Sequence, residues 1–162
     1  MAATVLVCLV TDLTRGLIYN WVTLPAALSG LFLGWWYGGP AGLGWAGAGL
    51  VVGGGVLLAP FFMGMVGGGD VKLLAAVGAL GGPMFGLKTT IYACLLGGAV
   101  ALVIMLANGK FLQGLKETGR FFWGLMLTRS ASAKPASLGL PAIPFGVCIA
   151  GGAVWARFWD IL

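Results

Sequence analysis

The sequence predicts an all-α membrane protein: a bundle of about six transmembrane helices with one interfacial amphipathic segment. Of its 162 residues, 60% are hydrophobic and only 8% are charged, whereas about 25% of the residues in a typical soluble domain are charged. Apolar runs recur along the whole chain, with no polar half that could fold as a separate soluble domain. We therefore expect residues 1–162 to form a single transmembrane domain.

Six apolar stretches are candidate spans, because about 20 mostly apolar residues cross a bilayer. They cover residues 2–16, 21–37, 41–63, 66–81, 84–107 and 140–159. Glycine–proline turns at residues 38–40 and 81–83 separate two pairs of neighbouring spans. No basic segment precedes the first stretch, so we do not expect a removable signal peptide. Glycine pairs four residues apart predict close helix packing: Gly30/Gly34, Gly49/Gly53, Gly64/Gly68 and Gly82/Gly86.

The one long connection, residues 108–139, is basic and is expected in the cytoplasm. Its first part, residues 111–127, mixes apolar side chains with Lys116, Glu117 and Arg120, which predicts an interfacial amphipathic helix. With six spans, all of the nine lysines and arginines except Lys88 and Arg157 fall on one side. The positive-inside rule places that side in the cytoplasm and both termini outside. We expect this loop to bind anionic lipid headgroups, and we expect no nucleic-acid partner.

The residue types present exclude several kinds of catalytic site. Histidine is absent, which excludes HExxH zinc proteases and every Ser–His or Cys–His nucleophile pair. Cys8, Cys94 and Cys148 form no CxxC pair, so neither a zinc site nor a disulfide framework is indicated. We expect no metal and no cofactor. Proton chemistry is left to carboxylates, lysines, tyrosines or thiols.

Two of the four carboxylates, Asp12 and Asp70, lie within apolar stretches at a similar predicted depth. At about 1.5 Å per residue, Asp12 lies about 17 Å along the first span, and Asp70 lies near the cytoplasmic start of the fourth. Carboxylates inside spans are costly and by default mark function. Two close carboxylates in a dry site share one proton, so one can activate water while the other polarises a carbonyl. Which aspartate takes which role is left open.

Each aspartate also has a structural interpretation. Asp12 could pair with Arg15 at the membrane interface, and Asp70 could cap the fourth helix while Lys72 sets the topology. Neither explains two aspartates at matching depth in a chain with four acids, of which Glu117 and Asp160 are expected at the solvated interface. The alternative function is a small proton-coupled membrane transporter or channel subunit that uses the two intramembrane aspartates.

The glycines before Asp70 leave room for an extended peptide beside its carboxylate. Gly67-Gly68-Gly69-Asp70 is a GxGD motif and, with residues 71–75, resembles the second active-site motif of the type IV prepilin peptidases. Residues 12–20 resemble their first motif, an aspartate followed by Ile-Pro-Asn, although Tyr19 stands where the family has proline. Ile143-Pro144-Phe145-Gly146 resembles the family's last span. The resemblance implies catalytic roles for Asp12 and Asp70, and supporting or substrate-binding roles for Gly67, Gly68, Gly69, Lys72 and Asn20.

The resemblance is to the short, peptidase-only branch that serves tight-adherence (Flp-type) pili, and to archaeal preflagellin peptidases. It implies a membrane-embedded aspartic endopeptidase of the inner membrane, with its active site facing the cytoplasm. The implied substrate is a membrane-inserted prepilin or pseudopilin precursor, whose short and often basic leader is removed for pilus or secretion-system assembly. Because nothing precedes the first span and paired cysteines are missing, we do not expect the methyltransferase activity of the larger family members.

Overall fold

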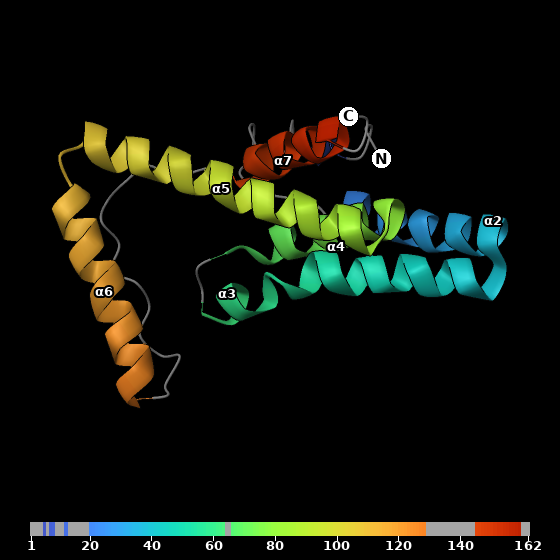
Figure 1. Ribbon diagram of the computed structural model, residues 1–162, viewed down its shortest axis with the longest axis horizontal. Coiled ribbons are helices and arrows are strands. Elements are labelled where there is room, and N and C mark those ends of the chain that lie inside the picture. The colour runs from blue at the N-terminus through green and yellow to red at the C-terminus, as the bar shows by residue number, and fades with distance from the viewer. Residues whose placement is uncertain are drawn as a thin grey trace.

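The computed structural model describes residues 5, 7, 8, 12, 20–63, 66–128 and 145–159. All regular structure in these residues is helical, which confirms the predicted all-α class. The first expected span, residues 2–16, lies mostly outside the described residues, as do residues 129–144 and 160–162. The helices are α2 (Asn20–Gly55), α3 (Leu58–Phe62), α4 (Gly68–Gly81), α5 (Pro83–Ala107), α6 (Phe111–Thr128) and α7 (Phe145–Trp159), as Figure 1 shows.

Helix α2 folds back on itself at Gly39. This residue leaves the helical conformation, with φ of 56° and ψ of −144°, and Pro40 follows it. A positive φ favours glycine, and proline suits the first turn of the helix that restarts there. The two halves run side by side in opposite directions (Figure 1), so closely that a Cβ atom added to Gly34 would lie 2.7 Å from the carbonyl oxygen of Gly42. The turn expected at residues 38–40 is therefore present.

Glycines bring α2, α4 and α5 into backbone contact. The α2–α4 pair makes the most extensive helix contact of the described residues. A Cβ atom added to Gly78 of α4 would lie 2.7 Å from the carbonyl carbon of Gly49 on α2. One added to Gly86 of α5 would lie 3.0 Å from the Cα atom of Gly78 and 3.3 Å from that of Gly53. Three of the predicted glycine pairs thus supply close contacts, while Gly64 lies outside the described residues.

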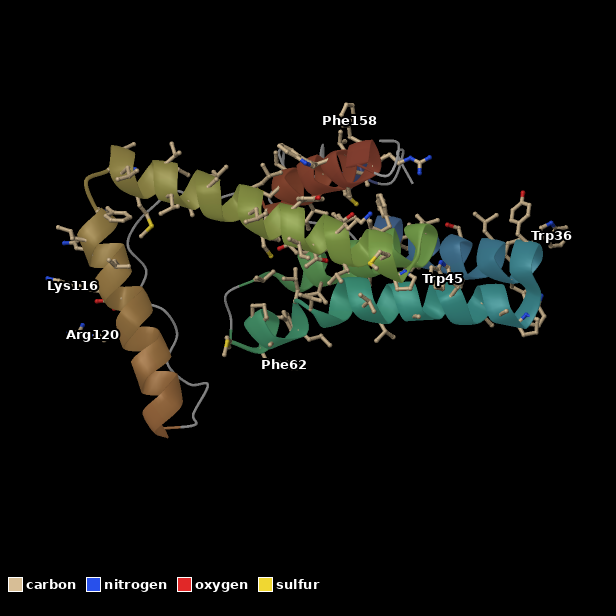
Figure 2. All side chains as sticks on the ribbon, in the orientation of Figure 1. Trp36, Trp45, Phe62, Lys116, Arg120 and Phe158 are labelled. Carbon is tan, nitrogen blue, oxygen red and sulfur yellow. The ribbon has the colours of Figure 1, made fainter. Side chains whose placement is uncertain are left out.

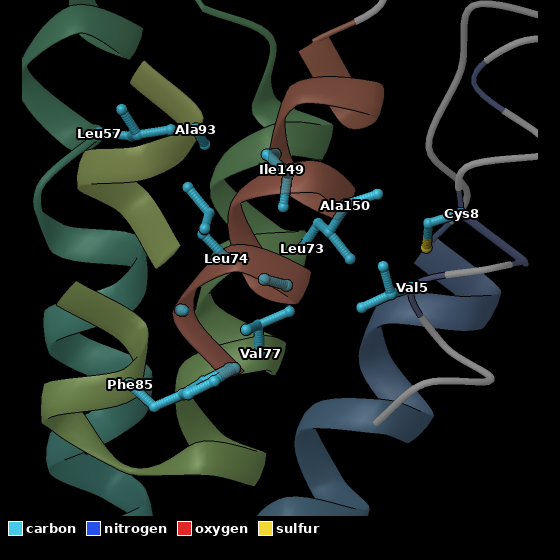
Figure 3. Packing of buried hydrophobic residues seen from close by; sticks show 12 residues of the cluster. Val5, Cys8, Leu57, Leu73, Leu74, Val77, Phe85, Ala93, Ile149 and Ala150 are labelled. Atoms are coloured by element: carbon cyan, nitrogen blue, oxygen red, sulfur yellow. The ribbon is translucent and has the colours of Figure 1, made fainter. Parts of the chain in front are cut away.

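The apolar core is centred on α4. Leu73, Leu74 and Val77 of α4 are fully buried, and Ile149 of α7 packs among them (Figure 3). Helix α7 lies against α5, because a Cβ atom added to Gly152 would lie 2.8 Å from the carbonyl oxygen of Thr89. Val5 and Cys8 also belong to this core. Val5 and Cys8 therefore pack in the same core as the buried side chains of α4 and α7.

Helix α6 projects away from the other helices at the far end of α5 (Figure 1). The chain turns there at Gly109, which has a φ of 63°. Lys116 and Arg120 extend from α6 on the side facing away from the bundle (Figure 2), and the Arg120 guanidinium lies 3.3 Å from a carboxylate oxygen of Glu117. Helix α6 covers the residues for which the sequence predicts an amphipathic helix.

One helix in the described part of the chain, α5, is long and apolar enough to cross a membrane. The apolar segment Phe145–Phe158 of α7 is shorter. Length and composition of this kind are also found in the core helices of soluble proteins, so one such helix is weak evidence for a membrane. The membrane location and the number of spans remain predictions.

Candidate active site

Asp12 is buried and is held by the start of α7. Its side chain is 8% exposed. The backbone N–H of Gly146 donates a hydrogen bond to Asp12 Oδ2 over 2.8 Å, and this bond is buried. Gly146 lies in the first turn of α7, where backbone N–H groups have no partner within the helix. A carboxylate at this position also lies at the positive end of the helix dipole.

Asp70 is half-buried in the first turn of α4. Gly67 immediately precedes this helix in an extended conformation, and its carbonyl oxygen accepts a hydrogen bond from the Asp70 N–H over 3.1 Å. A Cβ atom added to Gly67 would lie 3.1 Å from Asp70 Oδ2, and one added to Gly68 would lie 3.2 Å from the Phe61 ring. Gly69 lies in the same turn. The glycine run therefore lets the backbone pass close to the Asp70 carboxylate and to α3.

The Asp12 and Asp70 carboxylates lie close enough for the charge on one to act on the other. Cys148, in the first turn of α7, lies within electrostatic range of both. Among the described residues, no three His, Cys, Asp or Glu side chains gather as a metal site would require.

Lys72 and Asn20 connect α4 to the beginning of α2. The Lys72 ammonium donates a hydrogen bond to Asn20 Oδ1 over 2.9 Å, and both side chains are exposed. This bond joins the N-terminal parts of α4 and α2. Two of the five residues to which the resemblance assigns a supporting role, Lys72 and Asn20, thus contact each other.

Residues 1–102 match the family model of the type IV leader peptidases, which is more than half of the chain. The chain belongs to the type IV leader peptidase family. This confirms the resemblance seen in the sequence, and the matched range includes Asp12, Asn20, Asp70 and Lys72. Membership implies a peptidase that processes leader peptides. No curated protein and no solved structure matches the chain.

Gly146 is the residue at this site that the sequence did not single out. It lies beyond the matched range and 134 positions from its partner Asp12. The available signal was the stretch Ile143-Pro144-Phe145-Gly146, in which proline precedes the last apolar helix. That stretch predicts where a helix starts, but it does not predict which side chain lies at the start.

Proposed function

We propose that the chain is a membrane-embedded aspartic endopeptidase that removes the leader peptide from type IV prepilin or pseudopilin precursors. Asp12 and Asp70 are the proposed catalytic pair. The observation that carries the proposal is that the buried Asp12 carboxylate lies within electrostatic range of the half-buried Asp70 carboxylate, in a chain of the type IV leader peptidase family. Gly67 and Gly68 are proposed to support it, because their missing side chains leave room for the Asp70 carboxylate and for the Phe61 ring, and Gly69 lies in the same turn.

The proposed reaction is hydrolysis by one ionised and one protonated carboxyl group. The ionised carboxylate takes a proton from water, whose oxygen attacks the carbonyl carbon of the scissile peptide bond. The protonated carboxyl donates its proton to the carbonyl oxygen as the tetrahedral intermediate forms. When the C–N bond breaks, the carboxyl that took the proton from water gives it to the departing nitrogen, and the other carboxylate takes a proton back from a hydroxyl of the tetrahedral intermediate, so that both groups return to their starting states. The products are a new carboxyl end on the leader and a new amino end on the mature pilin.

We propose a multi-pass protein of the inner membrane, with the active site facing the cytoplasm and both termini outside. Large apolar side chains are exposed over the outward faces of α2 and α5, as expected for helices that contact lipid; they include Trp21, Leu28, Phe32, Leu95 and Val103. Lys116 and Arg120 face away from the bundle on α6, where they can contact anionic headgroups. No methyltransferase activity is proposed.

Co-expression with a candidate prepilin tests the function, with leader removal followed as a mobility shift on a gel. Asp12→Asn and Asp70→Asn should each abolish processing, because an amide can neither take a proton from water nor donate one as a carboxylic acid does. Both variants are close to isosteric with the wild type, so the amount of protein in the membrane should not fall.

Glu117→Gln is the matched control, because it removes a carboxylate that pairs with exposed Arg120 on the remote helix α6. This variant should process the precursor at the wild-type rate. Normal processing by Asp12→Asn would show that the aspartates are not a catalytic pair. Alkaline phosphatase and green fluorescent protein fusions to the connecting loops report the orientation independently.

A further inference from the structure

Gly146, at the start of α7, contacts Asp12 in two ways. The backbone N–H of Gly146 donates to Asp12 Oδ2 over 2.8 Å. The Cα atom of Gly146 also faces this side chain, since a Cβ atom added there would lie 2.5 Å from Oδ2 and 2.9 Å from Cγ. Contacts below 3.0 Å are essentially never made by real Cβ atoms. Any residue other than glycine would therefore displace the carboxylate or the helix.

The other described glycines of α7 make different contacts. A Cβ atom added to Gly151 would meet only the end of the flexible Leu96 side chain, at 3.0 Å. One added to Gly152 would meet the α5 backbone at 2.8 Å, so Gly152 serves helix packing. Among the glycines described in α7, Gly146 is thus the one whose missing side chain makes room for an acid.

We propose that Gly146 is a positioning residue that orients the Asp12 carboxylate toward Asp70. Its N–H fixes one carboxylate oxygen, and its bare Cα atom leaves the volume that the carboxylate occupies. The catalytic consequence rests on the proposed function, whereas the contact between Gly146 and Asp12 does not. The last helix thereby contributes to the active site although it lies outside the range that matches the family.

The electrostatic setting supports this role. A free N–H at a helix start makes a charge-assisted hydrogen bond to a carboxylate, which is shorter and stronger than a bond between neutral groups. Burial of the bond keeps water from competing for the same oxygen. Cys148, two residues further along α7, lies within electrostatic range of both Asp12 and Asp70.

A cycle of stability measurements tests the contact without any need for catalysis. Gly146→Ala should lower the midpoint of thermal unfolding in detergent for the wild type and for Asp12→Asn, whose side chain occupies the same space. In an Asp12→Ala background the same change should lower the midpoint by less than half as much, because the Oδ2 and Cγ atoms that the added methyl group would meet are gone. If Gly146→Ala lowers the unfolding midpoint equally in all three backgrounds, the proposal is wrong and Gly146 is a packing residue.

Cleavage kinetics test the positioning role. Gly146→Ala should lower kcat on the order of 100-fold with KM little changed, because it moves a reacting group and leaves substrate contacts in place. Gly151→Ala is the matched control on the same helix and should retain both constants. A wild-type kcat for Gly146→Ala would overturn the proposal. If the wild type cleaves no precursor, the proposed function fails, and the stability cycle still decides the contact.

Discussion

Adding one methyl group at Gly78 tests whether the bundle depends on backbone contact between α2 and α4. The methyl carbon would lie 2.7 Å from the carbonyl carbon of Gly49 and 3.3 Å from the Cα atom of Gly53. Carbon atoms pack best at about 3.5–4.0 Å. The two helices must therefore move apart by roughly 1 Å at this point, which also loosens the neighbouring contact between Gly78 and Gly86.

The size of the effect follows from two opposed contributions to the free energy of unfolding. Alanine in place of a helical glycine gains about 1 kcal/mol of helix propensity. Overpacking costs about 1–3 kcal/mol and lies at the upper end here, because backbone atoms cannot turn aside as side chains do. The net loss is about 1–2 kcal/mol. In a chain of this size, each kcal/mol lowers the unfolding midpoint by about 2–4 °C.

Thermal unfolding in detergent, followed by far-ultraviolet circular dichroism, measures the change. Gly44→Ala is the control, because this glycine is exposed on the α2 hairpin and a Cβ atom there would meet nothing within 4 Å. It should unfold at the wild-type midpoint or above it, while Gly78→Ala unfolds several degrees below. If Gly78→Ala and Gly44→Ala unfold at the same midpoint, α2 and α4 do not pack through their backbones as described.

Two further predictions concern the turn before α5 and the bond beside Asp70. Gly82 has a φ of 85° and its Cα atom faces the Trp45 indole nitrogen, so Gly82→Ala should lower the free energy of unfolding by about 1–3 kcal/mol. Gly38 faces open space, so Gly38→Ala should leave the free energy of unfolding unchanged. Equal unfolding midpoints for the two variants would contradict this prediction. Lys72→Met and Asn20→Ala each remove the exposed bond between α4 and α2, so both should slow prepilin cleavage while leaving the unfolding midpoint nearly unchanged. Wild-type cleavage by both variants would show that the bond has no part in the site.

Structural features that depend only on neighbouring residues in the chain could be predicted from the sequence. The turns at Gly39 and Gly82 follow from glycine and proline in succession, and both glycines have a positive φ. The α6 helix follows from the mixture of apolar and charged side chains over residues 111–127. Asp70 could be singled out because the glycines that accommodate it precede it directly. In each case the physical cause lies within a few residues of the effect.

Contacts between distant segments could not be predicted in this way. The burial of Asp12 depends on which helix start faces it, and the sequence places no constraint on the pairing of Asp12 with Gly146. The bond between Lys72 and Asn20 is similar, because its partners lie 52 positions apart and each alone reads as an exposed polar residue. The sequence predicted one apolar segment over residues 41–63, whereas a turn at residues 56–57 separates α2 from α3. Helix ends of this kind depend on tertiary packing.

Gly146 is added to the chain 134 residues after its partner Asp12, which also sets an order of events during synthesis. At about 5–20 residues per second, a ribosome needs roughly 7–27 s to add them. Asp70 is added 58 residues after Asp12, and for the following 76 residues the nascent chain carries both acids but lacks the Gly146 amide that binds Asp12. If Asp12 and Gly146 have the roles proposed above, the enzyme becomes able to cut its substrate only once the last helix has been made.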